Sequence, residues 1–158
     1  MKIVIYDQSF TSKIWRFVNT IYNEYNDALC LNDYDKDLLD IKTNYQEKGG
    51  QFWIGIDDEN NIIATCACRF YISNNKWMEL KRFFVLKNYR GRGIAHKLYN
   101  KIIEWSDKKE IENLIFWSDI RYKRAHNFFS KKGFEIIDKR NKYDSLIPYT
   151  EYCFMRKY

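Results

Sequence analysis

The spacing of apolar residues near the start of the sequence predicts a strand followed by a helix. Residues 3–6, Ile-Val-Ile-Tyr, form a short run that predicts a first strand. From Phe10 to Tyr25 the apolar positions recur at intervals of three and four, as on one face of a helix. Ser9 or Thr11 is a candidate cap for that helix.

A second stretch of helical spacing follows. Asp33 or Asp35 can cap this helix, and the residues Lys48, Gly49 and Gly50 signal its end. Its apolar stripe consists of Tyr34, Leu38, Ile41 and Tyr45.

The next apolar runs are strand-like. Residues 52–56 and 62–72 flank the polar turn at 57–61 and therefore predict a β-hairpin. Residues 73–75 form a predicted turn into a further strand at 78–85.

The segment after this strand combines a basic glycine turn with an amphipathic helix. The turn is Tyr89-Arg90-Gly91-Arg92-Gly93, and the helix face that follows contains Ile94, Leu98, Ile102 and Trp105. The first N–H groups of a helix lack intrahelical partners, and glycines let a ligand approach the backbone closely. This turn is therefore a predicted anion site, most simply for phosphate.

The remaining pattern completes one α/β (α+β) domain over residues 1–158. Residues 114–117 form a short apolar run typical of a buried parallel strand, Gly133 ends a helix, and strands are expected at 134–137 and 149–155. We expect a mixed, mostly antiparallel sheet with a central splayed parallel pair and helices on both faces.

Composition narrows the class of protein. The chain is 46% hydrophobic with a net charge of +6, and its basic residues are scattered among acidic ones. This favours attraction for a polyanionic cofactor over nucleic-acid binding. The four cysteines lack zinc-site spacing, and His96 and His126 lack matching ligands, so no metal is expected. Without a signal peptide or an apolar span, a cytoplasmic location with reduced cysteines is predicted.

Two common phosphate motifs do not fit the glycine turn. There is no G-x-x-x-x-G-K-[ST], and His96 occupies the third glycine position of G-x-G-x-x-G. Residues 90–95 instead match [QR]-x-x-G-x-[GA], and residues 117–134 contain Trp-Ser-Asp-x-Arg-Tyr and then a helix that ends at Gly-Phe. In these features the chain resembles the GNAT superfamily of acyl-CoA-dependent N-acyltransferases, in particular a bacterial subgroup with Trp-Ser-Asp-x-Arg-[FY].

The resemblance implies that acetyl-CoA is the co-substrate and that the early helices border an acceptor pocket. The glycine turn would bind its pyrophosphate, and the backbone of the central strand would bind its pantetheine arm, with the Val85 N–H polarising the thioester carbonyl. Asn127 would hydrogen-bond the pantetheine, or simply face solvent. The cofactor-binding residues expected on this basis are Phe83, Phe84, Val85, Arg90, Gly91, Arg92, Gly93, Ile94, Ala95 and Asn127.

Glu79 is the candidate catalytic residue. An amine attacks only when neutral, so a carboxylate or a water bound to one is the usual proton acceptor. Glu79 lies in a mostly apolar strand, near the position of the catalytic glutamate in the histone-acetylating branch of the superfamily. The alternatives are that Glu79 pairs with Lys81 or Arg82, or that it faces solvent.

One departure from the family concerns the leaving thiolate. Many relatives protonate it from a tyrosine four residues before the Gly-Phe pair, but Phe129 occupies that position here. Either water or another group such as Tyr122 protonates the thiolate, or it leaves unassisted.

The acceptor itself is left open. Asp119, Asp144 and Glu151 resemble acidic elements of the bacterial subgroup and are candidate ligands for a cationic acceptor, or are structural. A small-molecule or peptide amine is the expected partner, with no nucleic acid and no membrane, and a homodimer stays open. The alternatives are an acyl-CoA-binding sensor or assembly domain without turnover and, more weakly, an RNA-binding surface.

Overall fold

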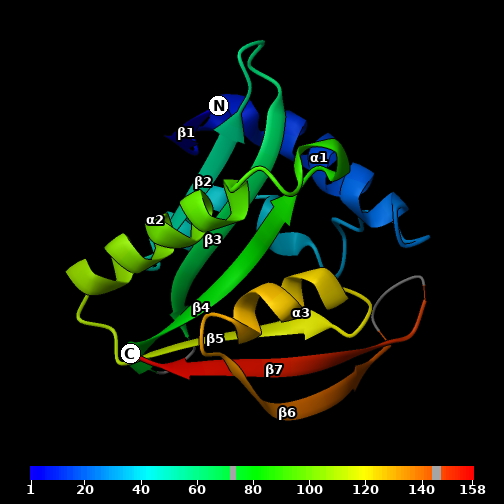
Figure 1. Ribbon diagram of the computed structural model, residues 1–158. Helices are drawn as coiled ribbons and strands as arrows, with labels where there is room; N and C mark the ends of the chain where they lie inside the picture. The colour runs from blue at the N-terminus through cyan, green and yellow to red at the C-terminus, as the bar shows by residue number, and fades with distance from the viewer. Residues whose placement is uncertain (72–73, 144–146) are drawn as a thin grey trace.

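The computed structural model of the protein describes residues 1–71, 74–143 and 147–158 (Figure 1). In this part of the chain seven strands form one sheet, in the order β1-β2-β3-β4-β5-β7-β6. The strands are β1 (Lys2–Ile5), β2 (Gln51–Ile56), β3 (Ile62–Tyr71), β4 (Asn74–Val85), β5 (Asn113–Asp119), β6 (Glu135–Lys142) and β7 (Tyr149–Lys157).

Neighbouring strands are antiparallel except for β4 and β5. That parallel pair is short, because its register runs only from Trp77 opposite Asn113 to Glu79 opposite Ile115. Beyond this point β4 and β5 diverge, as Figure 1 shows. The predicted mixed sheet with a central splayed parallel pair is confirmed.

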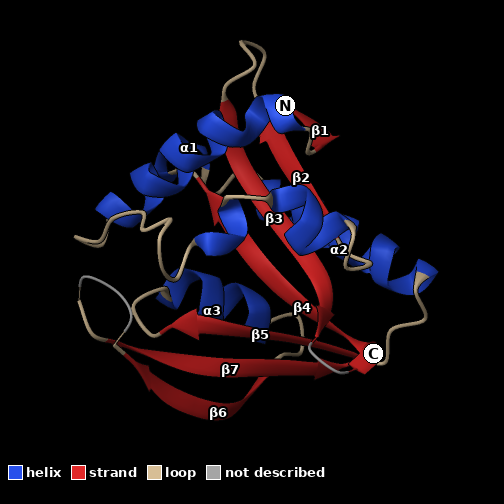
Figure 2. Ribbon diagram, turned by 180° about the vertical axis from the view of Figure 1, so that it is seen from behind, coloured by secondary structure: helices blue, strands red, loops and turns tan. Residues whose placement is uncertain are grey.

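Helices cover both faces of the sheet, as predicted (Figure 2). On one face, α2 (Ile94–Lys108) and α3 (Lys123–Ser130) bury residues such as Leu98 and Phe129. On the other face, α1 (Thr11–Asn23) packs over β2 and β3 with a separate apolar core. The sheet therefore separates two cores, and the gap between β4 and β5 lies open between them.

The predicted second helix is replaced by short turns. A 3₁₀ turn η2 (Lys36–Leu38) and a π-helical turn η3 (Lys42–Gln46) carry the apolar stripe, of which Leu38, Ile41 and Tyr45 are fully buried. Asp35 does not cap this segment, because its buried carboxylate binds Arg82 instead.

Other boundaries also differ from the expected ones. A 3₁₀ turn η1 (Gln8–Phe10) precedes α1, and Asp7 caps it by accepting from the Ser9 N–H at 2.9 Å, so neither Ser9 nor Thr11 caps α1. Residues 73–75 were predicted to form a turn, but Asn74 and Asn75 belong to β4. Ser73 lies outside the described residues, as does Ile72, the expected end of the preceding strand.

A β-bulge interrupts β4 just where it leaves β5. The register with β3 shifts between Thr65 and Ala67, and Arg82 has a φ of 52°. Positive φ is uncommon for a residue with a side chain. The Thr65 hydroxyl holds the bulge by donating to the Arg82 carbonyl at 2.7 Å. A further 3₁₀ turn, η4 (Lys87–Tyr89), then leads from β4 to the glycine turn.

Candidate active site

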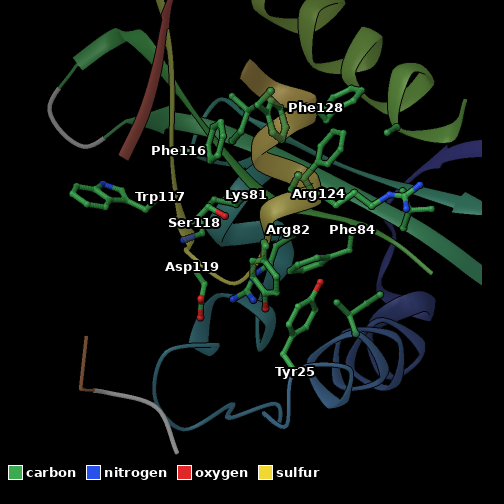
Figure 3. A pocket seen from close by; sticks show the side chains of 18 of the residues that line it. Tyr25, Lys81, Arg82, Phe84, Phe116, Trp117, Ser118, Asp119, Arg124 and Phe128 are labelled. Carbon is green, nitrogen blue, oxygen red and sulfur yellow. The ribbon is translucent and has the colours of Figure 1, made fainter. Parts of the chain in front are cut away.

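A cavity of about 600 Å³ lies where β4 and β5 part. It extends from the start of α2, along the gap between the two strands, to the facing ends of β6 and β7. Figure 3 shows side chains from β4 (Arg82, Phe84), β5 (Ser118, Asp119) and α3 (Phe128) around it. The cavity is thus continuous between the predicted anion turn and the polar residues predicted to meet an acceptor.

The anion turn has the backbone that close approach of a ligand requires. Gly91 and Gly93 adopt φ of 78° and 75°, and nothing lies within 4 Å of the position that a Cβ on Gly93 would occupy. Among the described residues, no side chain caps α2, so the first N–H groups of the helix face the cavity beside Ile94 and Ala95. These features fit a phosphate group.

The three arginines near this turn have different roles. Arg90 donates from Nε to the Val85 carbonyl at 2.8 Å and forms a bidentate pair with Glu24 at 2.8 and 2.9 Å, so it fastens the turn to β4 and α1. Arg92 is exposed, stacks over Tyr89 and does not line the cavity. Arg124, which sequence reasoning missed, lines the cavity, and its Nη2 is 3.9 Å from the position that a Cβ on Gly91 would occupy.

The end of β4 presents backbone groups to the gap. The Leu86 N–H donates to the Ile63 carbonyl of the β3 side at 2.9 Å. Because hydrogen-bonding direction alternates along an antiparallel strand, the Val85 N–H points to the opposite edge, toward β5. Since pairing with β5 ends at Glu79, this N–H faces the cavity, as the predicted oxyanion role requires.

The Phe83 and Phe84 side chains lie on opposite sides of β4 and are core residues, as expected. The Phe83 ring is 5.8 Å from that of Phe128, and the Phe84 ring is 6.1 Å from that of Tyr22, both measured between centroids. They therefore wall the cavity without offering a polar group.

Glu79 lines the cavity and is only 8% exposed. Its carboxylate accepts from Arg69 Nε at 2.9 Å and lies 3.9 Å from Lys81 Nζ. The sequence-based alternative of pairing with Lys81 is thus present, whereas Arg82 points elsewhere. Burial lowers the pKa of Lys81, although the neighbouring Glu79 opposes this shift.

Arg82 is the centre of a buried ionic cluster beside the cavity. Its guanidinium donates to Asp35 at 2.7 Å and to the Tyr22 hydroxyl at 2.9 Å, and it binds Asp37 through Nε at 3.0 Å. Burial alone would raise the pKa of Asp37, but Arg82 outweighs this and holds it well below its usual range. Residues 45 or more positions apart in the chain are therefore held together at the end of the cavity away from the glycine turn.

Two of the predicted acceptor ligands also line the cavity, and each is paired with an arginine. Asp119 is bound by Arg121, whose Nε lies at 2.9 Å, and Glu151 is bound by Arg140 at 2.7 Å. The Arg140 guanidinium in turn lies 3.9 Å from the centroid of the Trp117 ring.

Two other predicted residues are not placed in the cavity. Asn127 is exposed on α3 and does not line it. Asp144 lies outside the described residues.

Phe129, which occupies the position of the tyrosine found in many relatives, is a core residue. Phe129 is 2% exposed and its ring is 4.5 Å from that of Phe116. Tyr122 does line the cavity, but burial raises its pKa, which makes it a poorer proton donor.

A further polar pair went unnoticed in the sequence. Ser118, at the end of β5, lines the cavity, and its Oγ is 2.9 Å from Nε2 of His126 on α3. Only the strand-turn-helix geometry brings the two together. No group of three metal-ligating side chains occurs in the described part of the chain, and none of its helices is long and apolar enough to span a membrane.

Comparison with known proteins places this fold and cavity in a family. A profile of the acetyltransferase (GNAT) family matches residues 15–134, and the chain therefore belongs to that family.

A solved GNAT-family acetyltransferase from Staphylococcus aureus is 28% identical, with a TM-score of 0.87 over 99% of this chain and 98% of that one. A Streptococcus agalactiae acetyltransferase, 21% identical, has the same fold with a TM-score of 0.84 over 99% of this chain and 98% of that one.

Curated relatives are longer proteins that match a smaller share of this chain. N-acetylaspartate synthetase of Xenopus tropicalis is 29% identical over 64% of this chain and 37% of its own length. An uncharacterized N-acetyltransferase of Methanocaldococcus jannaschii is 28% identical over 57% of this chain and 41% of its own. The chain thus spans well under two thirds of either relative.

Proposed function

We propose that the protein is an N-acetyltransferase that moves the acetyl group of acetyl-CoA to a primary amine within a ternary complex. The observation that carries this proposal is the continuous cavity from the α2 N-terminus to the polar ends of β5 and β7. Solved proteins of this fold include an aminoglycoside acetyltransferase bound to coenzyme A and a Salmonella typhimurium protein bound to acetyl-CoA.

In this proposal the cofactor end uses mostly backbone. Gly91, Gly93 and the first turn of α2 bind the pyrophosphate, with Arg124 adding charge. The pantetheine lies along residues 83–85, and the Val85 N–H stabilises the oxyanion, a contribution of about 2.7–4 kcal/mol per donor.

Glu79 is the proposed acceptor of the first proton. A primary amine with a pKa of about 10 arrives protonated at neutral pH and must lose that proton before it attacks. Glu79 lies in the cavity wall, and its pairing with Arg69 fixes the orientation of the carboxylate. We propose transfer directly or through one water.

The amine enters from the end bordered by Asp119 and Glu151. These carboxylates would bind a cationic acceptor, whereas the guanidinium groups of Arg121 and Arg140 beside them would bind an acceptor that carries carboxylates. The name of N-acetylaspartate synthetase adds acidic amino acids to the acceptors to test.

A turnover screen tests the proposal. The purified protein is given acetyl-CoA and a panel containing aspartate, neutral amino acids, polyamines, aminoglycosides and lysine peptides, and both CoA thiol and acetylated product are measured. We expect product in equal amount to released thiol with at least one amine. Tight binding of acetyl-CoA without turnover on any amine would favour the sensor alternative, which the phenylalanine at position 129 supports.

Four narrower assignments belong to the same proposal. We place the chain in the bacterial subgroup with the Trp-Ser-Asp-x-Arg-[FY] element and expect it to act on neither nucleic acid nor membrane. A cytoplasmic location fits the free thiols, of which Cys66, Cys68 and Cys153 are buried. A homodimer is testable by light scattering.

A further inference from the structure

The pair formed by Ser118 and His126 lies at the point where the proposed reaction would take place. Ser118 follows Ile115, the last residue of β5 that pairs with β4, by three positions, so it borders the open gap. Its Oγ is 2.9 Å from His126 Nε2, and the imidazole lies behind it, away from the cavity. Ser118 is therefore the only member of the pair that a substrate would touch.

The surroundings of His126 favour its neutral form. Its ring packs against those of Tyr152 and Phe154 of β7, with centroids 6.1 and 4.8 Å away. The charged group that faces it from β5 is Asp119, which Arg121 already pairs. Burial lowers the pKa of His126, and Asp119 opposes this only in part. A neutral imidazole can accept a proton at Nε2.

We propose, on the basis of the proposed acetyl transfer, that Ser118 and His126 relay a proton from the attacking nitrogen to the leaving sulfur. Ser118 is the catalytic residue and His126 acts through it. The relay would replace the tyrosine that the family places where this chain has Phe129.

The amine nitrogen must lose two protons in the course of the reaction. The ammonium loses its first proton before attack. After the C–N bond forms, the nitrogen gives its second proton to Ser118 Oγ while the serine proton moves to His126 Nε2. As the C–S bond breaks, its electron pair leaves on sulfur, and the imidazolium returns a proton through Ser118 to the thiolate. The products are an amide and a thiol, and both side chains regain their starting states.

The test compares Ser118→Ala and His126→Gln with Ser118→Thr, which keeps a hydroxyl, and with Ser130→Ala, an exposed serine at the end of α3. We expect kcat to fall by about 10²-fold in the first two variants, to recover in part in Ser118→Thr and to stay unchanged in Ser130→Ala. The KM for acetyl-CoA should not change. In the wild type kcat should fall as pH drops below the pKa of His126, and both relay variants should lack this dependence.

A second readout does not need turnover. The chain has two histidines, so the imidazole nitrogens of His126 can be assigned by NMR with a His96→Gln variant. We expect the His126 pKa to lie below about 6.5 and to move on Ser118→Ala.

Three results would overturn the relay. The first is that the wild type turns over, but Ser118→Ala and His126→Gln keep kcat within twofold of it or keep its pH dependence. This result leaves the proposed function intact. The second is a His126 resonance that ignores Ser118→Ala. The third is a wild type without turnover on any amine, which would overturn the proposed function as well.

Discussion

The two ends of the cavity are built in different ways. At the α2 end most of the groups that face a ligand belong to one continuous segment, residues 83–96, and Arg124 of α3 joins them. At the other end they are side chains from α1, the 27–35 loop, β5, β6 and β7. The first end therefore depends on local conformation, and the second depends on contacts between distant parts of the chain.

Ion pairs carry those distant contacts. Arg82 joins β4 to Asp35 and Asp37, and Arg121 joins Asp119 to Asp27. Such clusters fix the shape of a pocket, but a single lost member leaves a buried charge unpaired. The acceptor end should thus be more easily broken by a side-chain substitution than the cofactor end.

The largest effect is expected at Arg82. Arg82→Leu leaves Asp35 and Asp37 without their cation in a buried site, which should lower the free energy of unfolding by about 3–5 kcal/mol in urea denaturation. Lys101→Ala, which breaks an exposed pair with Glu104, is the control and should change it little.

The Arg82 effect should depend on pH in one direction. Since the cluster holds the pKa of Asp37 below its usual value, the stabilisation is present above about pH 4 and is lost as pH falls further toward the folded pKa. Equal stability of variant and wild type at pH 7 would show that the cluster does not hold the acceptor end together.

Glu79→Gln should have the next largest effect. The variant keeps the size of the side chain but removes its basicity, so kcat/KM at neutral pH should fall by about 10²-fold or more. Acetyl-CoA affinity should be nearly unchanged, and activity should recover in part at high pH as neutral amine accumulates. Near-wild-type turnover would return Glu79 to a purely structural role with Arg69.

Substitutions in the glycine turn should change the affinity for acetyl-CoA. Gly91→Val or Gly93→Val blocks the backbone N–H groups, each worth about 1.5–3 kcal/mol toward a charged ligand, and should weaken acetyl-CoA binding about 10- to 100-fold in calorimetry. Gly133→Val is the matched control: its φ of 84° imposes the same strain outside the cavity. If all three variants bind alike, strain and not ligand contact explains the glycines.

The smallest effect is expected at Asn127. Because Asn127 is exposed on α3 and does not line the cavity, Asn127→Ala should leave acetyl-CoA affinity nearly unchanged in the same calorimetric titration. A two- to tenfold loss, equivalent to one hydrogen bond of about 0.5–1.5 kcal/mol, would instead support the contact with pantetheine expected from the sequence.

The contrast between local conformation and long-range contacts also explains which parts of the fold could be predicted from the sequence. The strand, glycine turn and helix around Gly91 follow from local spacing, and residues 78–105 adopt the expected order of elements. The helix expected around Leu38 broke into short turns, because Asp35 and Asp37 bind Arg82 and take the chain out of helical register. The spacing of neighbouring residues cannot indicate an ion pair between residues so far apart in the chain.

The site residues divide similarly. Val85, Gly93 and Glu79 could be proposed from the sequence because a motif, or a charge in an apolar strand, marks them, and all three line the cavity. Ser118 lies in the Trp-Ser-Asp-x-Arg-Tyr element, but neither its contact with His126 nor the place of Arg124 in the cavity could be predicted from one sequence, because both arise only when α3 packs beside β5. The arginine partners of Asp119 and Glu151 were missed for the same reason.

One measurement tests most directly the claim that backbone along the gap between β4 and β5 and at the α2 N-terminus holds the cofactor. Coenzyme A is titrated into ¹⁵N-labelled protein, and amide chemical shifts are followed by NMR. The account predicts the largest changes at Val85 and at residues 91–96, with little change in β1 and β2. Changes concentrated on another surface, with Val85 and the glycine turn unaffected, would contradict it.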